Sequence, residues 1–299
     1  MKQLTPALML LIMASAAPVF AQSEPLTGTL AKIDQTGVIA IGYRQAESPF
    51  SFEGADGSVT GFSIDLCAHI VERVRTELGR DDIAVEYVAA TPATRFILVK
   101  TGQIDLECAA TTNNAERREV VDFSYPHFMT ATRVMSRRAD SIQSLQDLAG
   151  HSVASASGTV NIEQLNAINR EQTLNIAVIP TKSTTEAFDM VVNERASAFV
   201  TDGILLAVKI AETPDPSLYA LSDFALSRSE PYGLLFQRGD AAFKRLVNET
   251  LENVYVSGEI NEIYAKWFTS PIPPSGINLN LPMSDDMVTA FSTPAEYLD

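Results

Sequence analysis

Short apolar runs alternate with amphipathic stretches in the first half of this chain. "GVIAIGY" (residues 37–43) is typical of a buried strand, as are "IAVEYV" (83–88) and "IDLEC" (104–108). After Ser63, a suitable N-cap, apolar residues at 66, 70, 71, 74 and 78 have helical spacing. Residues 94–102 also suit a short helix. This βαβαβ order predicts an open, mostly parallel sheet flanked by helices.

A second α/β series follows, which predicts a second lobe. We expect strands at "SVASA" (152–156), "IAVIP" (176–180) and "SAFVTD" (197–202), with helices from Ile162 and around Glu186–Glu194. Both series end strands in polar residues, and open α/β sheets bind ligands at the carboxyl ends of their strands. The rest of the chain predicts a strand at "YGLLF" (232–236) and one long helical stretch over residues 243–268.

The first residues have the features of an export signal. Lys2 precedes the apolar run "PALMLLIMASAAPVF", and "VFA" places small residues before a cleavage site after Ala21. No cysteine follows that run directly, so we expect no lipid attachment. The sequence therefore predicts a periplasmic protein without direct membrane insertion.

The net charge of −15 argues against nucleic acid or an anionic membrane surface as a partner. The chain has two cysteines, Cys67 and Cys108, which could form a disulfide in an oxidising compartment or remain buried thiols. No CxxC spacing indicates redox or metal chemistry, and we expect no cofactor.

Three arginines follow three expected strands of the first sheet. Arg44 comes directly after the first strand, and Arg95 and Arg117 open the helices after the next two. Guanidinium groups bind carboxylates through paired hydrogen bonds, so this placement predicts a small ligand with more than one negative group. In the second lobe, Asp202 ends a strand and is placed to meet a cation.

Arg117 and Arg118 fall in the first turn of an expected helix, where the unpaired N–H groups oppose a cation. A bound anion would make such a placement favourable. We expect Arg117 to bind ligand and Arg118 to face the surface. "SGT" (157–159) lies between a strand and a helix and could hold an anion through backbone N–H groups, or could serve only as a capping turn.

Several segments resemble family 3 of the ABC-transporter solute-binding proteins, which bind polar amino acids in the periplasm. The resemblance rests on "GFSIDLC", "IDLECAATTNNAERREVVDFSYP", "SGT", "AFVTD", "PYGLLF" and "EINEIYAKWF". "TTNNAERR" and "KWFTSPIPPSGINLNLPMSDDM" look more narrowly like the glutamate/aspartate-binding branch. The resemblance implies a two-lobed periplasmic-binding-protein fold, each lobe a mostly parallel sheet flanked by helices, joined by two hinge strands.

The resemblance also implies boundaries for these parts. They are a signal peptide (1–21), lobe 1 (22–127 and, with the C-terminal tail, 235–299), hinges (128–131 and 230–234) and lobe 2 (132–229).

The same resemblance implies roles for individual residues. Arg117 and Thr112, with Thr159 across the cleft, would hold the α-carboxylate of the ligand, and Asp202 would take its α-ammonium group. Arg44 and Arg95 would hold the side-chain carboxylate of an acidic amino acid. The implied partner is an ABC-transporter membrane permease, and the binding protein itself is expected to be a monomer.

Three positions depart from the pattern of the near relatives. Ala110 stands where they have a hydroxyl residue, Pro92 where they have serine, and Thr184 where they have histidine. These changes leave glutamate, aspartate, a related amide (glutamine or asparagine) or a slightly larger acidic ligand open.

Two other functions remain as alternatives. The fold family includes periplasmic cyclohexadienyl dehydratases, for which Glu47, Glu107 or Glu116 could supply an acid. However, HExxH, GxSxG, Walker and GxGxxG motifs are absent, and we expect a binding protein rather than an enzyme. A sensor module that presents the ligand to a receptor would have the same sequence features.

Overall fold

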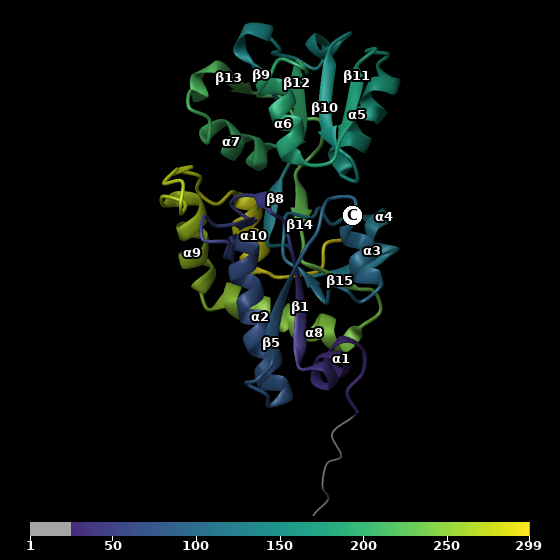
Figure 1. Cartoon of the computed structure of the whole chain (residues 1–299), viewed down its shortest axis with the longest axis vertical. Helices are drawn as coiled ribbons and strands as arrows, with labels where there is room; N and C mark the ends of the chain where they lie inside the picture. The colour runs from purple at the N-terminus through teal and green to yellow at the C-terminus, as the bar shows by residue number, and fades with distance from the viewer. Residues whose placement is uncertain (1–24, 299) are drawn as a thin grey trace, which may run out of the picture.

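The computed structural model describes residues 25–298 and consists of two α/β lobes, one above the other in Figure 1. The expected signal peptide, residues 1–21, lies outside the described residues. Each lobe contains a five-stranded sheet with helices packed on it. The architecture is therefore the predicted two-lobed α/β fold.

The sheet of the first lobe has the strand order β5-β1-β6-β15-β7. β1 pairs in parallel with β5 and β6, whereas β15 pairs antiparallel with β6 and β7. The bounds are β1 Val38–Tyr43, β5 Ala84–Ala89, β6 Leu106–Glu107, β7 Val121–Phe123 and β15 Leu235–Gln237. Because β15 comes from late in the chain, two separate segments build this lobe.

Helices and a small three-stranded sheet complete the first lobe. The helices are α1 Gly28–Thr36, α2 Phe62–Leu78, α3 Arg95–Lys100, α4 Ala115–Arg118, α8 Ala241–Val256, α9 Glu259–Tyr264 and α10 Asp285–Ser292. The small sheet joins β2 Ala46–Glu47, β3 Ser51–Glu53 and β4 Val59–Thr60. A disulfide joins Cys67 on α2 to Cys108 just after β6, so neither cysteine is a free thiol.

Two details of this lobe differ from the sequence prediction. α2 begins at Phe62 after Gly61, and Ser63 is not its cap, because the buried Ser63 hydroxyl contacts the Ala109 carbonyl and His127 instead. The expected long helix over residues 243–268 is interrupted at Gly258. The left-handed φ of +86° at that glycine ends α8 and redirects the chain into α9 and the π-helical turn Ala265–Thr269.

The second lobe has the strand order β11-β10-β12-β9-β13. Its strands are β9 Thr132–Arg137, β10 Ser152–Ala156, β11 Ala177–Thr181, β12 Ala198–Asp202 and β13 Tyr219–Leu221. Its helices are α5 Val160–Glu171, α6 Thr184–Val192 and α7 Gly203–Ala211, with 3-10 turns at Arg138–Asp140, Gln146–Leu148 and Pro216–Leu218. β10 pairs in parallel with β11 and β12, and separate apolar clusters form its core.

A two-stranded antiparallel ribbon runs between the lobes. It pairs β8 Phe128–Thr130 with β14 Glu230–Tyr232, which lie in the two segments expected to be hinges. The single strand expected at residues 232–236 is therefore two strands, β14 in the ribbon and β15 in the first sheet. A break at Gly233–Leu234 separates them and lets the chain pass from one sheet to the other.

Candidate functional site

A cavity lies between the lobes, at the carboxyl ends of parallel strands from both sheets. Residues that follow β1, β5 and β6 line it on the side of the first lobe, and residues at or after the ends of β10, β11 and β12 line it on the side of the second. All eight residues named from the sequence line it: Arg44, Arg95, Ala110, Thr112, Arg117, Thr159, Thr184 and Asp202. A cavity at strand ends of both lobes is where open α/β sheets are expected to bind a ligand.

Arg117 is held on the first-lobe wall by backbone carbonyls. Its Nη1 donates to the Thr112 carbonyl at 2.8 Å, and its Nη2 lies 3.4 Å from the Gly158 carbonyl across the cleft. The side chain is buried, and burial lowers its pKa. None of the described carboxylates lies within ion-pair distance of it, and this suits an anionic group of a ligand.

In the structure, the position of Arg117 in its helix is not electrostatically unfavourable. α4 has only four residues, and the Asn114 side chain caps it by accepting from the Arg117 backbone N–H at 2.9 Å. So short a helix has only a small dipole, and Arg117 and Arg118 stand in its last turn. Arg118 is half-buried, binds Asn113 Oδ1 at 2.8 Å and does not line the cavity.

The opposite wall begins with the amino terminus of α5. Thr159 is its N-cap, and its hydroxyl accepts from the Ile162 N–H and donates to the Ala156 carbonyl. The first N–H groups of a helix have no partner within the helix, so those of Val160 and Asn161 suit an anion placed between α5 and Arg117.

Asp202 ends β12 and lies almost fully buried at the same cavity. Its Oδ2 accepts from the Tyr232 hydroxyl at 2.5 Å and its Oδ1 from Asn161 at 2.9 Å. Burial raises the pKa of this carboxyl, and these two hydrogen bonds oppose that shift. No lysine, arginine or histidine in residues 25–298 forms an ion pair with it, which suits a cationic group of a ligand.

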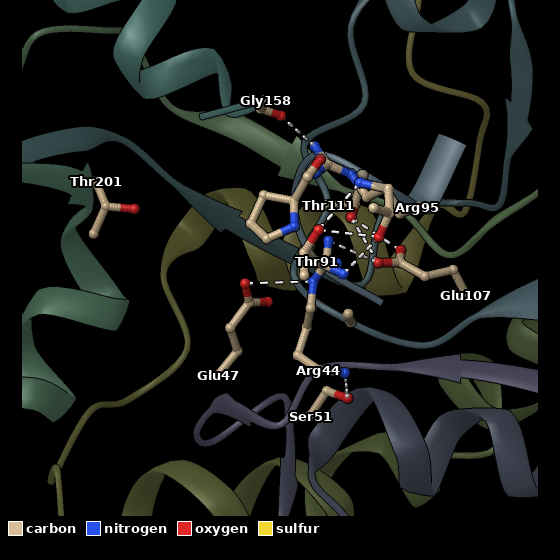
Figure 2. A network of polar contacts seen from close by, with 12 residues as sticks. Arg44, Glu47, Ser51, Thr91, Arg95, Glu107, Thr111, Gly158 and Thr201 are labelled. Carbon is tan, nitrogen blue, oxygen red and sulfur yellow. Dashed lines mark hydrogen bonds and ion pairs between the residues drawn. The ribbon is translucent and has the colours of Figure 1, made fainter. Parts of the chain in front are cut away.

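A buried cluster of arginines and glutamates, drawn in Figure 2, also borders the cavity. Arg44 Nη2 lies 3.0 Å from Glu107 Oε1, and Arg44 Nε lies 3.4 Å from Glu47 Oε1. Arg95 donates to the Pro92 carbonyl and, at 3.1 Å, to the Gly158 carbonyl of the other lobe. Burial lowers the pKa of Arg95, and the nearby Arg117 and Arg44 lower it further.

Further cavity-lining residues were not among those named for the site: Glu47, Pro92, Val160, Asn161, Thr201 and Leu205. The sequence could have indicated two of these as site residues, because Asn161 lies shortly after the "SGT" turn and Thr201 directly precedes Asp202. The sequence suggests Glu47 only as an acid for the dehydratase alternative. It ends the two-residue strand β2, too short for a periodic pattern, so the sequence does not show that its side chain is buried in the cavity.

The other two acids of that alternative do not line the cavity. Glu107 is fully buried and accepts from the Thr111 hydroxyl, whereas Glu116 is exposed on α4. Within residues 25–298, no group of three His, Cys, Asp or Glu side chains is placed to hold a metal ion. The same residues include no helix that is both long and apolar enough for a membrane span.

Comparison with known proteins identifies the family. Residues 39–270 match the model of the bacterial extracellular solute-binding proteins, family 3. An L-glutamate/L-aspartate-binding protein of Pseudomonas aeruginosa is 40% identical over 94% of this chain and 92% of its own. A glutamate/aspartate import solute-binding protein of Escherichia coli is 35% identical over 97% of this chain and 96% of its own.

Solved structures agree on the architecture. An ancestral arginine-binding protein bound to arginine superposes with a TM-score of 0.70 at 27% identity, covering 78% of this chain and 98% of that one. An ancestral amino acid-binding protein, described as a precursor of cyclohexadienyl dehydratase, superposes with a TM-score of 0.67 at 29% identity. The match covers 80% of this chain and 99% of that one. Because the family model matches residues 39–270, which are most of the chain, this chain belongs to the bacterial extracellular solute-binding proteins of family 3.

Proposed function

We propose that this protein is the periplasmic binding component of an ABC importer for an acidic L-amino acid, glutamate or aspartate. In this proposal the signal peptide is cleaved after Ala21, and the mature monomer closes on its ligand and delivers it to a membrane permease. The names of the relatives support an acidic amino acid, and the site supports an α-amino acid of some kind.

One observation supports an α-amino acid as the ligand. Arg117 from the first lobe and Asp202 from the second line the same cavity, and neither has an ion-pair partner in the described chain. A buried charge without a partner is costly, so both charges favour a ligand that brings a carboxylate and an ammonium group together. Thr112, Thr159 and the amino terminus of α5 would complete the carboxylate contacts.

The side chain of the ligand would extend toward Arg44 and Arg95. Ala110 and Thr184 line the cavity as well and are small, so they leave room for that side chain. Membership in a family of solute-binding proteins favours this function over a dehydratase. Incubation with prephenate or arogenate should accordingly yield no aromatic product.

Calorimetry tests the proposal directly. Ligand-stripped protein is titrated with glutamate, aspartate, glutamine and asparagine at the acidic end of the range in which the protein is stable. We expect one of the two acidic amino acids to bind at least about tenfold more tightly than its amide, a difference of about 1.4 kcal/mol. Equal affinity for all four would contradict a role for Arg44 and Arg95 in reading the second carboxylate.

A further inference from the structure

A carboxyl group of the protein itself occupies the end of the cavity assigned to the side chain of the ligand. Glu47, on β2, lines the cavity with Arg44 and Arg95 and is only 7% exposed. Its Oε1 lies 3.4 Å from Arg44 Nε, which is too loose for a paired hydrogen bond. Its Oε2 is buried and has no hydrogen-bond partner.

The charges at this end balance before any ligand arrives. Two buried arginines, Arg44 and Arg95, face two buried glutamates, Glu47 and Glu107. Arg44 is paired with Glu107 at 3.0 Å, and Thr111 donates to both oxygens of Glu107. A second carboxylate from the ligand would therefore add a negative charge that no remaining cation neutralises, and such a buried charge is costly.

The buried atoms of the cluster that have no hydrogen-bond partner include both donors and an acceptor. Arg44 Nη1 and Arg95 Nε are buried donors without an acceptor, and Glu47 Oε2 is a buried oxygen without a donor. The cluster thus offers N–H groups to an acceptor and an oxygen to a donor. A ligand group that satisfies both must accept from arginine and share a hydrogen with Glu47.

Building on the proposed function, we propose that Glu47 is a specificity-determining residue that admits a dicarboxylic amino acid only together with a proton. That proton is held between Glu47 Oε2 and one oxygen of the distal carboxylate, while Arg44 donates to the other oxygen. A primary carboxamide supplies an acceptor and a donor without net charge, and so it binds without taking up a proton.

The surroundings of Glu47 support proton uptake. Arg44 after β1 and Arg95 on α3 favour its ionised form, while Glu107 on β6 and Asp202 on β12 disfavour it. Burial is the largest influence, and the pKa of Glu47 is raised. A ligand carboxylate would raise it further, because two like charges this close cannot both be ionised cheaply.

The test is calorimetry of the ligand-stripped protein with glutamate and glutamine, in buffers of different ionisation enthalpy and from about pH 5 to pH 8. For glutamate we expect uptake of about one proton within that range and an affinity that falls by up to about tenfold per pH unit as the pH rises. Glutamine should show neither effect, and it serves as the control for ionisations common to both ligands, such as those of Asp202 and the α-amino group.

Two variants complete the experiment. Glu47→Gln can still donate to a carboxylate but carries no charge, so its affinity for glutamate should become independent of pH and exceed the wild-type value at the alkaline end. Glu86→Gln makes the same substitution at an exposed position of the same lobe and should behave as the wild type.

Wild-type binding of glutamate without proton uptake would overturn the inference and leave the proposed function intact, as would an unchanged pH slope in Glu47→Gln. Failure of all the amino acids to bind would overturn both. The number of protons that the wild-type protein takes up on binding glutamate tests the inference even if Glu47→Gln fails to fold.

Discussion

Gly158 of the second lobe lies so close to Pro92 of the first that a Cβ atom on Gly158 would stand 2.8 Å from the Pro92 carbonyl oxygen. The same glycine has a φ of +78°, and its carbonyl accepts from Arg95 at 3.1 Å. The two lobes therefore meet at a point that only glycine allows, beside the "SGT" turn and at the edge of the cavity.

We expect Gly158→Ala to hinder approach of the lobes. The added methyl group would contact backbone atoms of Pro92 and Ala93, which move only with the lobe itself. Affinity should fall at least about tenfold, and small-angle scattering with saturating ligand should show a more open particle. Gly150→Ala is the matched control: its φ of +73° carries the same backbone strain, but its Cβ would meet open space. Equal effects of the two substitutions would show that strain, and not contact between the lobes, is responsible.

Arg117→Ala should abolish high-affinity binding of every α-amino acid, whatever its side chain. Truncating one partner of a buried charged pair costs about 2–5 kcal/mol, so calorimetry should show a loss of about 30-fold or more. Arg118→Ala, next in sequence but outside the cavity lining, should change affinity by less than about threefold. An Arg117→Ala protein that binds as tightly as the wild type would remove Arg117 from the site.

Asp202→Asn should weaken binding about 100-fold while leaving the ligand-free protein at least as stable. Burial raises the pKa of Asp202, so its ionised form destabilises the empty fold above the unfolded pKa of about 3.9, and the neutral amide removes that cost. Calorimetry and thermal unfolding of the same sample separate the two effects. Asp189→Asn, at an exposed position of the second lobe, should alter neither quantity. A large drop in Tm for Asp202→Asn would indicate a structural role.

His127 should make the fold sensitive to acid. Burial lowers its pKa from 6.5 to about 3, and Nε2 contacts the Ser63 hydroxyl at 3.0 Å. The folded state thus keeps a neutral imidazole that the unfolded chain protonates below pH 6.5. Its contribution to stability is fully present above pH 6.5 and is lost as the pH falls toward 3, by up to about 1.4 kcal/mol per pH unit. Denaturant unfolding of His127→Gln at several pH values should show a shallower loss of stability, and a loss as steep as in the wild type would contradict this role of His127.

Reduction of the disulfide should lower stability with little effect on affinity. Cys67 and Cys108 close a loop of 41 residues within the first lobe, for which loop-closure entropy predicts a stabilisation of about 4 kcal/mol. Thermal unfolding with and without dithiothreitol, and of the Cys67→Ala/Cys108→Ala double variant, measures this effect. Ligand affinity should remain within about threefold, because neither cysteine lines the cavity. A Tm unaffected by reductant would contradict a stabilising bond.

Much of the site was predictable because it follows strand ends. Arg44 directly follows a short apolar run, Asp202 ends another, and Thr159 caps the helix that follows a third, and parallel strands bring their carboxyl ends to one edge of a sheet. The predictions failed where local pattern was ambiguous. The apolar spacing of residues 243–268 continued through Gly258, but a left-handed glycine ends a helix whatever the spacing around it.

The sequence by itself determined the α/β class, the second α/β series and the strand-end positions of Arg44, Arg95, Arg117 and Asp202, because strand and helix periodicity are local properties of the chain; Ala110, Thr112 and Thr184 were indicated only by the family resemblance. Only the tertiary structure decided which charges face one another. Glu47 reaches Arg44 from a two-residue strand, and Tyr232 reaches Asp202 from the ribbon between the lobes. Gly158 meets Pro92 only because the lobes approach. The contacts of Asp202 and Gly158 join residues far apart in the chain, and Glu47 lies on a strand of only two residues, so no periodic pattern encodes these contacts.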